Sequence, residues 1–299
     1  MRLMTYNIDH SYAAAWNDKM FNCDAKNKFG LENDIMNYDL SLLKEIIISA
    51  AREELLPRFA DVHRDIKMDG SFVTEADLAT QARILRELNR HYPDADVLGE
   101  EMTAEQQGEL LANSESLWCL DPLDGTSNFA VGTPYYAISL ALIERGVTTL
   151  GIVYDPNRDE CFVGVRGQGA FLNDAPLKVR PVDLPLSKCT ALIDFKRLPK
   201  SLAMNLVNHQ PYSSQRSYGS VALDWCWLAA SRVHVYLHGA SNLWDYSAGQ
   251  LIFSEAGGCS STLQGEAIFV HDLSKRSSVG ALDRSMFDAW YGWLREHND

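Results

Sequence analysis

Carboxylates gather in two short motifs of the sequence, and each motif follows an apolar segment. Leu98–Glu101 reads LGEE, and Asp121–Thr126 reads DPLDGT. Functional side chains often lie in loops at strand ends, and a loop through Pro122 could turn Asp121 and Asp124 toward one point. Carboxylates held together repel one another unless a proton or a cation lies between them. Oxygen ligands without His or Cys favour Mg²⁺, Mn²⁺ or Ca²⁺ over Zn²⁺, so the motifs indicate a site for a hard divalent cation.

Further segments could complete such a site, although each also has a purely structural interpretation. Gly125 and Thr126 offer two N–H groups and a hydroxyl at the start of an expected helix, where an anion binds well. Asp, Pro and Gly are also simply common in turns. Thr74 and Asp77 have the spacing of a helix capping box. Asp245, in the motif WDYSAG, would stabilise the positive end of a helix dipole. The purely structural interpretations become less convincing only when the segments are considered together.

The periodicity of apolar side chains predicts the elements that would position these residues. Helical spacing follows Asp39, which can cap the helix, and recurs from Thr74 until shortly before Pro93. After Pro93 short apolar runs bounded by Gly, Asp and Pro predict strands. The expected strands of the first half are Leu117–Leu120, Ala137–Ile143, Thr149–Tyr154 and Cys161–Arg166, the last three antiparallel.

The second half of the sequence alternates between strands and helices. Its expected strands are Ala191–Phe195, Val233–Leu237 and Cys259–Leu263, and its expected helices are Ser220–Ser231 and Trp244–Ala256. A last helix carries an aromatic stripe, which is typical of a core-facing surface and less often of a subunit contact. The stripe consists of Phe287, Trp290, Tyr291 and Leu294.

This order of elements predicts a layered α/β fold with mixed sheets. We expect residues 1–37 to be an irregular extension, because they are polar and show no sustained period. Residues 38–185 would form an α+β lobe that carries most of the candidate ligands, and residues 186–299 an α/β lobe. The seam would fall near residues 180–190.

Composition excludes several classes of protein. Of 299 residues, 46% are hydrophobic and 22% charged, which is typical of a globular chain. The formal charge of −13 weighs against direct nucleic-acid binding, which relies on basic surface. No apolar run is long enough to cross a bilayer and no secretory signal is evident, so we expect a cytoplasmic protein without membrane contact. Six scattered cysteines without metal-type spacing indicate buried free thiols in a reducing compartment.

Several motifs occur together in the order that a known family shows. They are DGSFVTEAD (Asp69–Asp77), GEE (Gly99–Glu101), DPLDGTSNF (Asp121–Phe129), GxGAFxN (Gly167–Asn173) and WDYSAG (Trp244–Gly249). With these motifs the chain resembles the inositol monophosphatase family of Mg²⁺-dependent, lithium-sensitive sugar phosphatases, from about Leu40 to Asp283. The resemblance implies an α-β-α-β-α sandwich with mixed sheets and a homodimer.

The resemblance also implies roles for individual residues. Two or three Mg²⁺ ions would be held by Glu100, Asp121, the backbone carbonyl of Leu123, Asp124 and Asp245, with the weakest ion near Glu100 and Asp77. Thr126 and Asp77 match the pair that orients and deprotonates the attacking water. The phosphate would lie against the amides of Gly125 and Thr126, beside Asp124. Paired ions of this kind can activate water and stabilise the leaving oxygen of a phosphate monoester.

The expected substrate pocket departs from the family at one position. Members selective for myo-inositol phosphates carry a Glu seven residues before the Asp of the WD motif, where this chain has His238. An imidazole could contact a polyol, bind a second anionic group when protonated, or only cap the strand end. Ser220 and Ala222 lie where the family contacts the sugar. Lys196 and Arg197 could meet a second phosphate or sulfate or be solvated, and the solvated surface is the commoner outcome.

We therefore expect a Mg²⁺-dependent phosphomonoesterase that acts on inositol 1-phosphate or a similar small polyol phosphate. Fructose 1,6-bisphosphatase, 3′-phosphoadenosine 5′-phosphate phosphatase and histidinol-phosphate phosphatase are alternatives of the same superfamily. An alternative of another class is a regulatory protein that keeps the fold and acts by binding another protein or RNA machinery. The complete set of candidate catalytic residues argues against lost catalysis.

Overall fold

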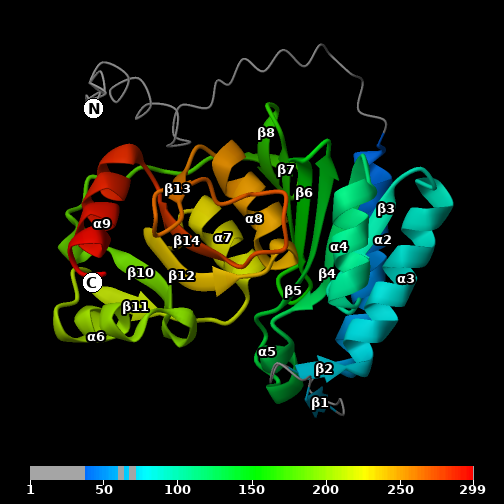
Figure 1. Ribbon diagram of the computed structural model, residues 1–299, viewed down its shortest axis with the longest axis horizontal. Helices are drawn as coiled ribbons and strands as arrows, with labels where there is room; N and C mark the ends of the chain where they lie inside the picture. Colours follow the sequence, from blue (N-terminus) through cyan, green and yellow to red (C-terminus); the bar gives the residue numbers. More distant parts are fainter. Residues whose placement is uncertain (1–37, 60–63, 67–71, 299) are drawn as a thin grey trace, which may run out of the picture.

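A computed structural model of the chain describes residues 38–59, 64–66 and 72–298. The extension expected over residues 1–37 lies outside the described residues, and so do residues 69–71 of the first family motif. Two large sheets organise the described chain (Figure 1). A short antiparallel pair, β1 (Arg64–Ile66) and β2 (Phe72–Thr74), lies apart from them and leads into the first site residue.

The larger sheet has seven strands in sequence order, β3 to β9. Only β3 and β4 are parallel, and each later neighbour is antiparallel, so the sheet is mixed. Its strands are β3 (Asp96–Gly99), β4 (Ser116–Asp124), β5 (Ala137–Glu144), β6 (Val147–Asp155), β7 (Glu160–Val165), β8 (Gly169–Leu172) and β9 (Ala175–Leu177).

The smaller sheet has five strands in the order β11-β10-β12-β14-β13. Here β10 pairs in parallel with both of its neighbours, whereas β14 is antiparallel to β12 and to β13. The bounds are β10 (Thr190–Asp194), β11 (Ser214–Arg216), β12 (Val235–Ser241), β13 (Cys259–Ser261) and β14 (Arg276–Ala281).

Helices cover the outer face of each sheet and fill the space between the sheets. Figure 1 shows α2 and α3 outside the larger sheet, α7 and α8 in the middle, and α9 and α6 beyond the smaller sheet. This arrangement confirms the predicted α-β-α-β-α sandwich. The helices are α2 (Leu40–Ala50), α3 (Glu75–His91), α4 (Ala104–Asn113), α5 (Thr126–Val131), α6 (Lys200–Asn208), α7 (Val221–Ala229), α8 (Leu243–Glu255) and α9 (Arg284–Glu296).

The outer helices are amphipathic in the way their sequences predict. Asp39 caps α2 by accepting hydrogen bonds from the N–H groups of Ser41 and Leu42. The predicted apolar face of α2 is buried, and the chain continues through a π-helical turn and a 3₁₀ turn before residue 59. On α9, the side chains of the predicted stripe that are buried in the core are Phe287, Trp290 and Leu294.

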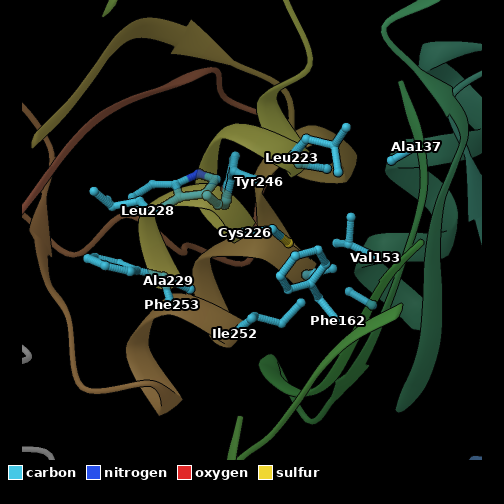
Figure 2. Packing of buried hydrophobic residues seen from close by; sticks show 14 of the residues in the cluster. Ala137, Val153, Phe162, Leu223, Cys226, Leu228, Ala229, Tyr246, Ile252 and Phe253 are labelled. Carbon is cyan, nitrogen blue, oxygen red and sulfur yellow. The ribbon is translucent and has the colours of Figure 1, made fainter. Parts of the chain in front are cut away.

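The middle layer is apolar on both sides because it faces two sheets. Figure 2 shows side chains of α7 and α8 meeting those of β5, β6 and β7. At two points the α8 backbone lies so close to the larger sheet that no side chain fits between them. A Cβ placed on Gly151 would lie 2.7 Å from the carbonyl oxygen of Ala248, and one on Gly164 would lie 2.8 Å from the Cα of Ile252. Helix α8 is therefore pressed onto β6 and β7.

Several expectations about elements need correction. The expected loop after Leu120 is still strand, since β4 runs to Asp124 with an irregular register from Asp121 onward. The sequence patterns do not predict helix α6 or strand β14, although β14 pairs with β12 in the smaller sheet. The division into lobes at residues 185 and 186 stays a prediction.

The cysteine prediction is confirmed at four positions and wrong at one. The buried free thiols are Cys119, Cys161, Cys189 and Cys226. Cys259 is disulfide-bonded, and Cys23 lies outside the described residues. Within the described ranges, no helix combines the length and the apolar character that crossing a bilayer requires.

Candidate active site

Asp77 lies at the start of α3, where it serves the helix and contacts a second candidate residue. Its Oδ2 accepts hydrogen bonds from the N–H (2.7 Å) and the hydroxyl (2.6 Å) of Thr74, which forms the predicted capping box. Its Oδ1 accepts a hydrogen bond from the hydroxyl of Thr126 at 3.2 Å. The structure thus brings together the predicted pair Asp77 and Thr126, which come from α3 and α5.

Asp121 and Asp124 lie at the end of β4, where the ladder with β5 is interrupted between them. Asp121 Oδ1 accepts a hydrogen bond from the N–H of Leu123 at 3.0 Å. The carbonyl of Leu123 accepts a hydrogen bond from the hydroxyl of Thr126 at 3.1 Å. The irregular strand end thus places two carboxylates and one backbone carbonyl directly before α5.

The N-terminus of α7 holds the side chain of Asp124. Asp124 Oδ2 accepts hydrogen bonds from the hydroxyl of Ser220 (2.6 Å) and from the N–H of Ala222 (2.7 Å). Ser220 is also the N-cap of α7 and is buried. The hydroxyl expected near a sugar is therefore engaged with a candidate metal ligand.

Asp245 occupies the first turn of α8, as predicted. Its Oδ2 accepts hydrogen bonds from the backbone N–H (2.7 Å) and the side-chain amide (3.2 Å) of Asn242, which completes a capping box. Glu100 follows β3 directly, and its N–H donates to the carbonyl of Leu120 at 3.2 Å. We call Glu100, Asp121, Asp124 and Asp245 the carboxylate cluster.

Burial and neighbouring carboxylates raise the pKa values of three members of the carboxylate cluster, Asp121, Asp124 and Asp245. Burial and the negative charges of Glu100, Asp124 and Asp245 raise the pKa of Asp121 well above its ordinary value. Burial raises the pKa of Asp124 to about 6, and burial together with Asp124 and Glu100 raises the pKa of Asp245 to about 7. The cluster therefore lacks positive charge to balance its carboxylates.

A hard divalent cation fits this donor set. The cluster offers only oxygen ligands, and the raised pKa values show that positive charge, as protons or metal, is favoured there. As placed, no group of three or more His, Cys, Asp or Glu side chains among the described residues is arranged so that it could hold a metal ion. The fit therefore rests on the chemistry of the oxygen donors and not on a preformed coordination sphere.

The N-terminus of α5 lies where the sequence predicts anion binding, which stays a prediction. Gly125 is its N-cap and adopts a left-handed conformation with φ of 99°. A Cβ at this position would lie 3.0 Å from the carbonyl oxygen of Tyr135 and 3.2 Å from the Cα of Tyr136. Both the backbone angle and the close approach require glycine, so the local sequence determines how α5 begins.

His238 lies in the middle of β12 (Val235–Ser241), so it does not cap a strand end, and it pairs with a carboxylate on β10. Its Nε2 lies 3.3 Å from Asp194 Oδ2, and the two residues are opposite each other in the parallel ladder. Burial opposes ionisation of Asp194, but the hydrogen bond and charge of His238 hold its pKa below the usual value. His238 is 3% exposed and its Nδ1 has no partner in the described structure. The positive charge of His238 also favours ionisation of Asp245.

Lys196 and Arg197 directly follow β10, in a single turn of 3₁₀ helix. Both side chains are exposed, and within the described ranges neither forms an ion pair with a carboxylate. Their exposure favours the solvated interpretation over a contact with a second phosphate.

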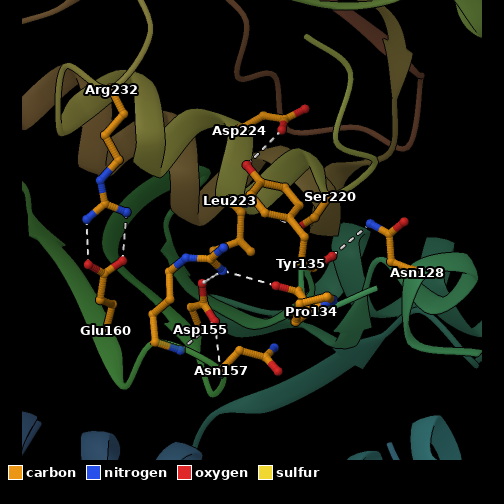
Figure 3. A network of polar contacts seen from close by, with 11 residues as sticks. Asn128, Pro134, Tyr135, Asp155, Asn157, Glu160, Ser220, Leu223, Asp224 and Arg232 are labelled. Atoms are coloured by element: carbon orange, nitrogen blue, oxygen red, sulfur yellow. Dashed lines mark hydrogen bonds and ion pairs between the residues drawn. The ribbon is translucent and has the colours of Figure 1, made fainter. Parts of the chain in front are cut away.

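The sequence motifs do not predict a polar network beside the site, which Figure 3 shows. Tyr135 donates its hydroxyl to Asp224 at 3.0 Å. The Asn128 side-chain amide donates to the carbonyls of Tyr135 (2.8 Å) and Tyr218 (2.6 Å). An Asp within the apolar run of α7 was the available signal in the sequence.

Five alternating layers and a carboxylate cluster at the ends of strands and helices define a sandwich of the sugar-phosphatase type. The chain belongs to the inositol monophosphatase family, whose model matches residues 36–296. This membership supports a phosphatase of that superfamily.

Relatives of the chain align with it over much of their length. The chain is 39% identical to Nus factor SuhB of Pasteurella multocida (66% of this chain, 74% of the relative). It is 36% identical to inositol monophosphatase of Mesembryanthemum crystallinum (74% and 86%). Among solved structures, extragenic suppressor protein suhB of Bartonella henselae superposes with a TM-score of 0.74 at 26% identity (86% and 98%). Inositol monophosphatase of Anabaena gives a TM-score of 0.70 at 28% identity (86% and 95%).

Proposed function

We propose that the chain is a Mg²⁺-dependent phosphomonoesterase that hydrolyses inositol 1-phosphate or a similar small polyol phosphate. The observation that carries the proposal is the carboxylate cluster beside a hydroxyl–carboxylate pair, Thr126 and Asp77. Family membership and the inositol monophosphatases among its relatives support the same activity.

The carboxylate cluster and the carbonyl of Leu123 would hold two or three Mg²⁺ ions. Charge neutralisation around the phosphate and acidification of the attacking water are the chemistry that Mg²⁺ supplies at such a site. The N–H groups of Gly125 and Thr126, at the start of α5, would bind phosphate oxygens and orient the ester. Asp124 has its Oδ2 fixed by α7, so it would present a defined orientation to the ion.

Asp77 would act as the general base through Thr126. The Thr126 hydroxyl donates to Asp77 Oδ1, so it can accept a hydrogen bond from water while a proton moves to the carboxylate. Burial, with smaller effects of Glu100 and Glu101, raises the pKa of Asp77 to about 6 against the opposing hydrogen bonds of Thr74. A base with a pKa near neutrality can both accept a proton and release it within one turnover.

Substrate choice would depend on His238. Asp194 Oδ2 lies 3.3 Å from Nε2 of His238 and so fixes one ring nitrogen. This pair could bond a polyol hydroxyl, or attract a second anionic group as in a bisphosphate. We favour the polyol because several relatives and structural neighbours are inositol monophosphatases.

A substrate panel tests the proposal. Phosphate release would be measured with inositol 1-phosphate, fructose 1,6-bisphosphate, 3′-phosphoadenosine 5′-phosphate and histidinol phosphate, with and without Mg²⁺ and lithium. Preference for the inositol ester is the expected result. Preference for a doubly charged substrate would reassign the specificity, and no Mg²⁺-dependent turnover on any ester would overturn the proposal.

A second candidate function is regulatory binding. Several relatives at 35–39% identity are named Nus factor SuhB, a name that does not describe a phosphatase activity. An Asp77→Asn chain, which should fold but not turn over, would be expressed in cells that lack the wild-type protein. Full restoration of the wild-type phenotype by this variant would assign the biological role to binding. Failure to restore it would assign the role to catalysis.

The family resemblance also leads us to propose a homodimer. Sedimentation equilibrium of the purified chain would measure its mass against the 33.5 kDa of one copy. A mass of a single copy at every concentration tested would contradict this part of the proposal.

A further inference from the structure

A buried Tyr–Asp pair lies directly behind the carboxylate cluster. The hydroxyl of Tyr135 donates to Asp224 Oδ1 at 3.0 Å, and each residue is 4% exposed. Tyr135 precedes β5, whereas Asp224 lies in the first turn of α7, so the bond joins the larger sheet to the middle layer. Figure 3 shows Tyr135 between Asp224, Asn128 and the segment at Pro134.

The same turn of α7 holds Asp124. The N–H of Asp224 donates to the carbonyl of Ser220 at 2.9 Å, and Ser220 donates its hydroxyl to Asp124. Because Ser220, Ala222 and Asp224 belong to one turn of helix, a displacement at Asp224 is transmitted to both donors of Asp124. The bond from Tyr135 therefore acts on a candidate metal ligand through a rigid element.

The backbone of Tyr135 is tied to the phosphate end of the site. Its carbonyl accepts a hydrogen bond from the side chain of Asn128, and the same amide donates to the carbonyl of Tyr218, two residues before the N-cap of α7. The Tyr135 ring packs on Tyr218 at 4.8 Å and on Trp227 at 5.0 Å between ring centroids. Tyr135 thus connects the start of α5 with the start of α7.

Stability alone does not explain a carboxyl group at this position. An apolar side chain would pack in α7 without the cost of removing Asp224 from water, and buried polar pairs are often replaceable without loss of stability. Burial raises the pKa of Asp224 well above its ordinary value, and the charges of Asp124 and Asp194 add to this effect. The hydrogen bond from Tyr135 acts in the opposite direction and lowers the pKa. The buried pair therefore costs folding stability, and it lies beside the site that it could orient.

We propose that Tyr135 and Asp224 are positioning residues that fix the first turn of α7 so that Ser220 and Ala222 hold Asp124 ready to bind Mg²⁺. This inference rests on the proposed function, because it assigns Asp124 to the metal site. It makes Mg²⁺ affinity, rather than the chemical step, depend on a hydroxyl that touches neither substrate nor ion.

Calorimetric titration with Mg²⁺ tests the pair on the full-length chain. We expect Tyr135→Phe to weaken Mg²⁺ binding roughly tenfold, the effect of about one lost hydrogen bond. Asp224→Asn keeps an oxygen that can accept from Tyr135, so it should bind Mg²⁺ nearly as the wild type does. Tyr212→Phe removes a hydroxyl from a buried Tyr of another core cluster and is the matched control.

The double variant Tyr135→Phe/Asp224→Leu separates positioning from stability. Because both polar partners are removed, its melting temperature should return close to that of the wild type, while its Mg²⁺ binding stays weak. In turnover assays, the Mg²⁺ concentration for half-maximal rate should rise while kcat at saturating Mg²⁺ changes little. Wild-type Mg²⁺ affinity in Tyr135→Phe or in the double variant would overturn the positioning role.

The titration also distinguishes failure of this inference from failure of the proposed function. A wild-type chain that binds Mg²⁺ but hydrolyses no phosphate ester would overturn the proposed function and leave the effect of the pair on Mg²⁺ binding measurable. A wild-type chain that binds no Mg²⁺ would overturn both.

Discussion

Single carboxylates in this protein serve the helix and the site at the same time. Asp77 caps α3 through one oxygen and accepts from Thr126 through the other. Asp245 caps α8 while it lies in the carboxylate cluster. A capping-box position immobilises the side chain, because the backbone N–H of the N-cap residue donates to one of its oxygens. Capping and chemistry are therefore compatible interpretations of the same residue.

Replacing Asp77 with asparagine should separate its two roles. In Asp77→Asn the amide oxygen can still accept from Thr74, but the NH₂ group cannot accept from Thr126. We expect kcat to fall by roughly 100-fold or more, as for loss of a general base, with little change in melting temperature. Asp39→Asn, at the N-cap of α2, is the matched control and should keep activity. Normal turnover in Asp77→Asn would remove Asp77 from the proposed mechanism.

His238→Gln should affect substrate binding more than the chemical step. Gln keeps hydrogen-bonding groups but lacks the imidazole ring, whose Nε2 lies 3.3 Å from Asp194 Oδ2. We expect KM for the polyol phosphate to rise about tenfold with a smaller change in kcat, measured by initial rates at saturating Mg²⁺. A KM equal to that of the wild type would exclude His238 from the substrate site.

At the scale of elements, the site is made of termini. The ends of β3 and β4 and the first turns of α3, α5 and α8 carry every predicted catalytic and metal-binding residue, and the first turn of α7 holds one of them in place. First turns of helices present free N–H groups and a positive dipole end, which suit phosphate and carboxylates alike. The geometry of each terminus therefore controls the site more directly than the packing of helix interiors does.

Gly125→Ala tests the terminus of α5. Alanine at φ of 99° is strained, and its Cβ would also meet the Tyr135 carbonyl oxygen at 3.0 Å. Gly167→Ala is the matched control, since Gly167 has φ of 74° with open space around a Cβ. We expect the control to lose about 1 kcal/mol of stability, and Gly125→Ala to lose more together with most activity. Denaturant unfolding and turnover would be measured for both, and equal behaviour of the two variants would contradict this account.

At the scale of the molecule, the sandwich places three carboxyl groups of the site where burial opposes their ionisation. Asp121, Asp124 and Asp245 all have folded pKa values above the ordinary carboxyl value, chiefly because of burial. A folded chain that binds more protons than the unfolded chain loses stability as pH rises. The metal-free protein is therefore expected to weaken between about pH 4, the unfolded pKa, and about pH 7.

Melting temperatures at different pH values measure this effect. For the metal-free protein, the contribution of these carboxylates should be largest near about pH 4 and should be lost as pH rises through about 7. At a pH above neutrality, excess Mg²⁺ should raise the melting temperature by about 5 °C. At about pH 5 the increase should be much smaller, because protons compete with Mg²⁺ for the carboxylates. Asp121→Asn should flatten both dependences. An increase in stability of the metal-free chain from about pH 5 to neutrality would contradict the electrostatic account.

The sequence by itself determined the layered class of the fold, most strands and helices, and the candidate residues of the site. Local chemistry explains this success, because periodicity and capping act over a few residues. The pattern of apolar residues does not predict strand β14, because Ser277 and Ser278 are polar although they are buried. The sequence favours a loop at the end of β4 because Asp and Pro seldom continue a strand.

Only the tertiary structure decided which distant side chains meet. The bonds from Thr126 to Asp77, from Ser220 to Asp124 and from Tyr135 to Asp224 join residues 49, 96 and 89 positions apart. No local pattern encodes such pairs, since the first depends on how α3 and α5 meet and the other two on how α7 packs against the larger sheet. Burial, which raises the pKa values of the cluster, is likewise a property of the assembled layers. The residue types are therefore a property of the sequence, and their proximity and charge state are properties of the fold.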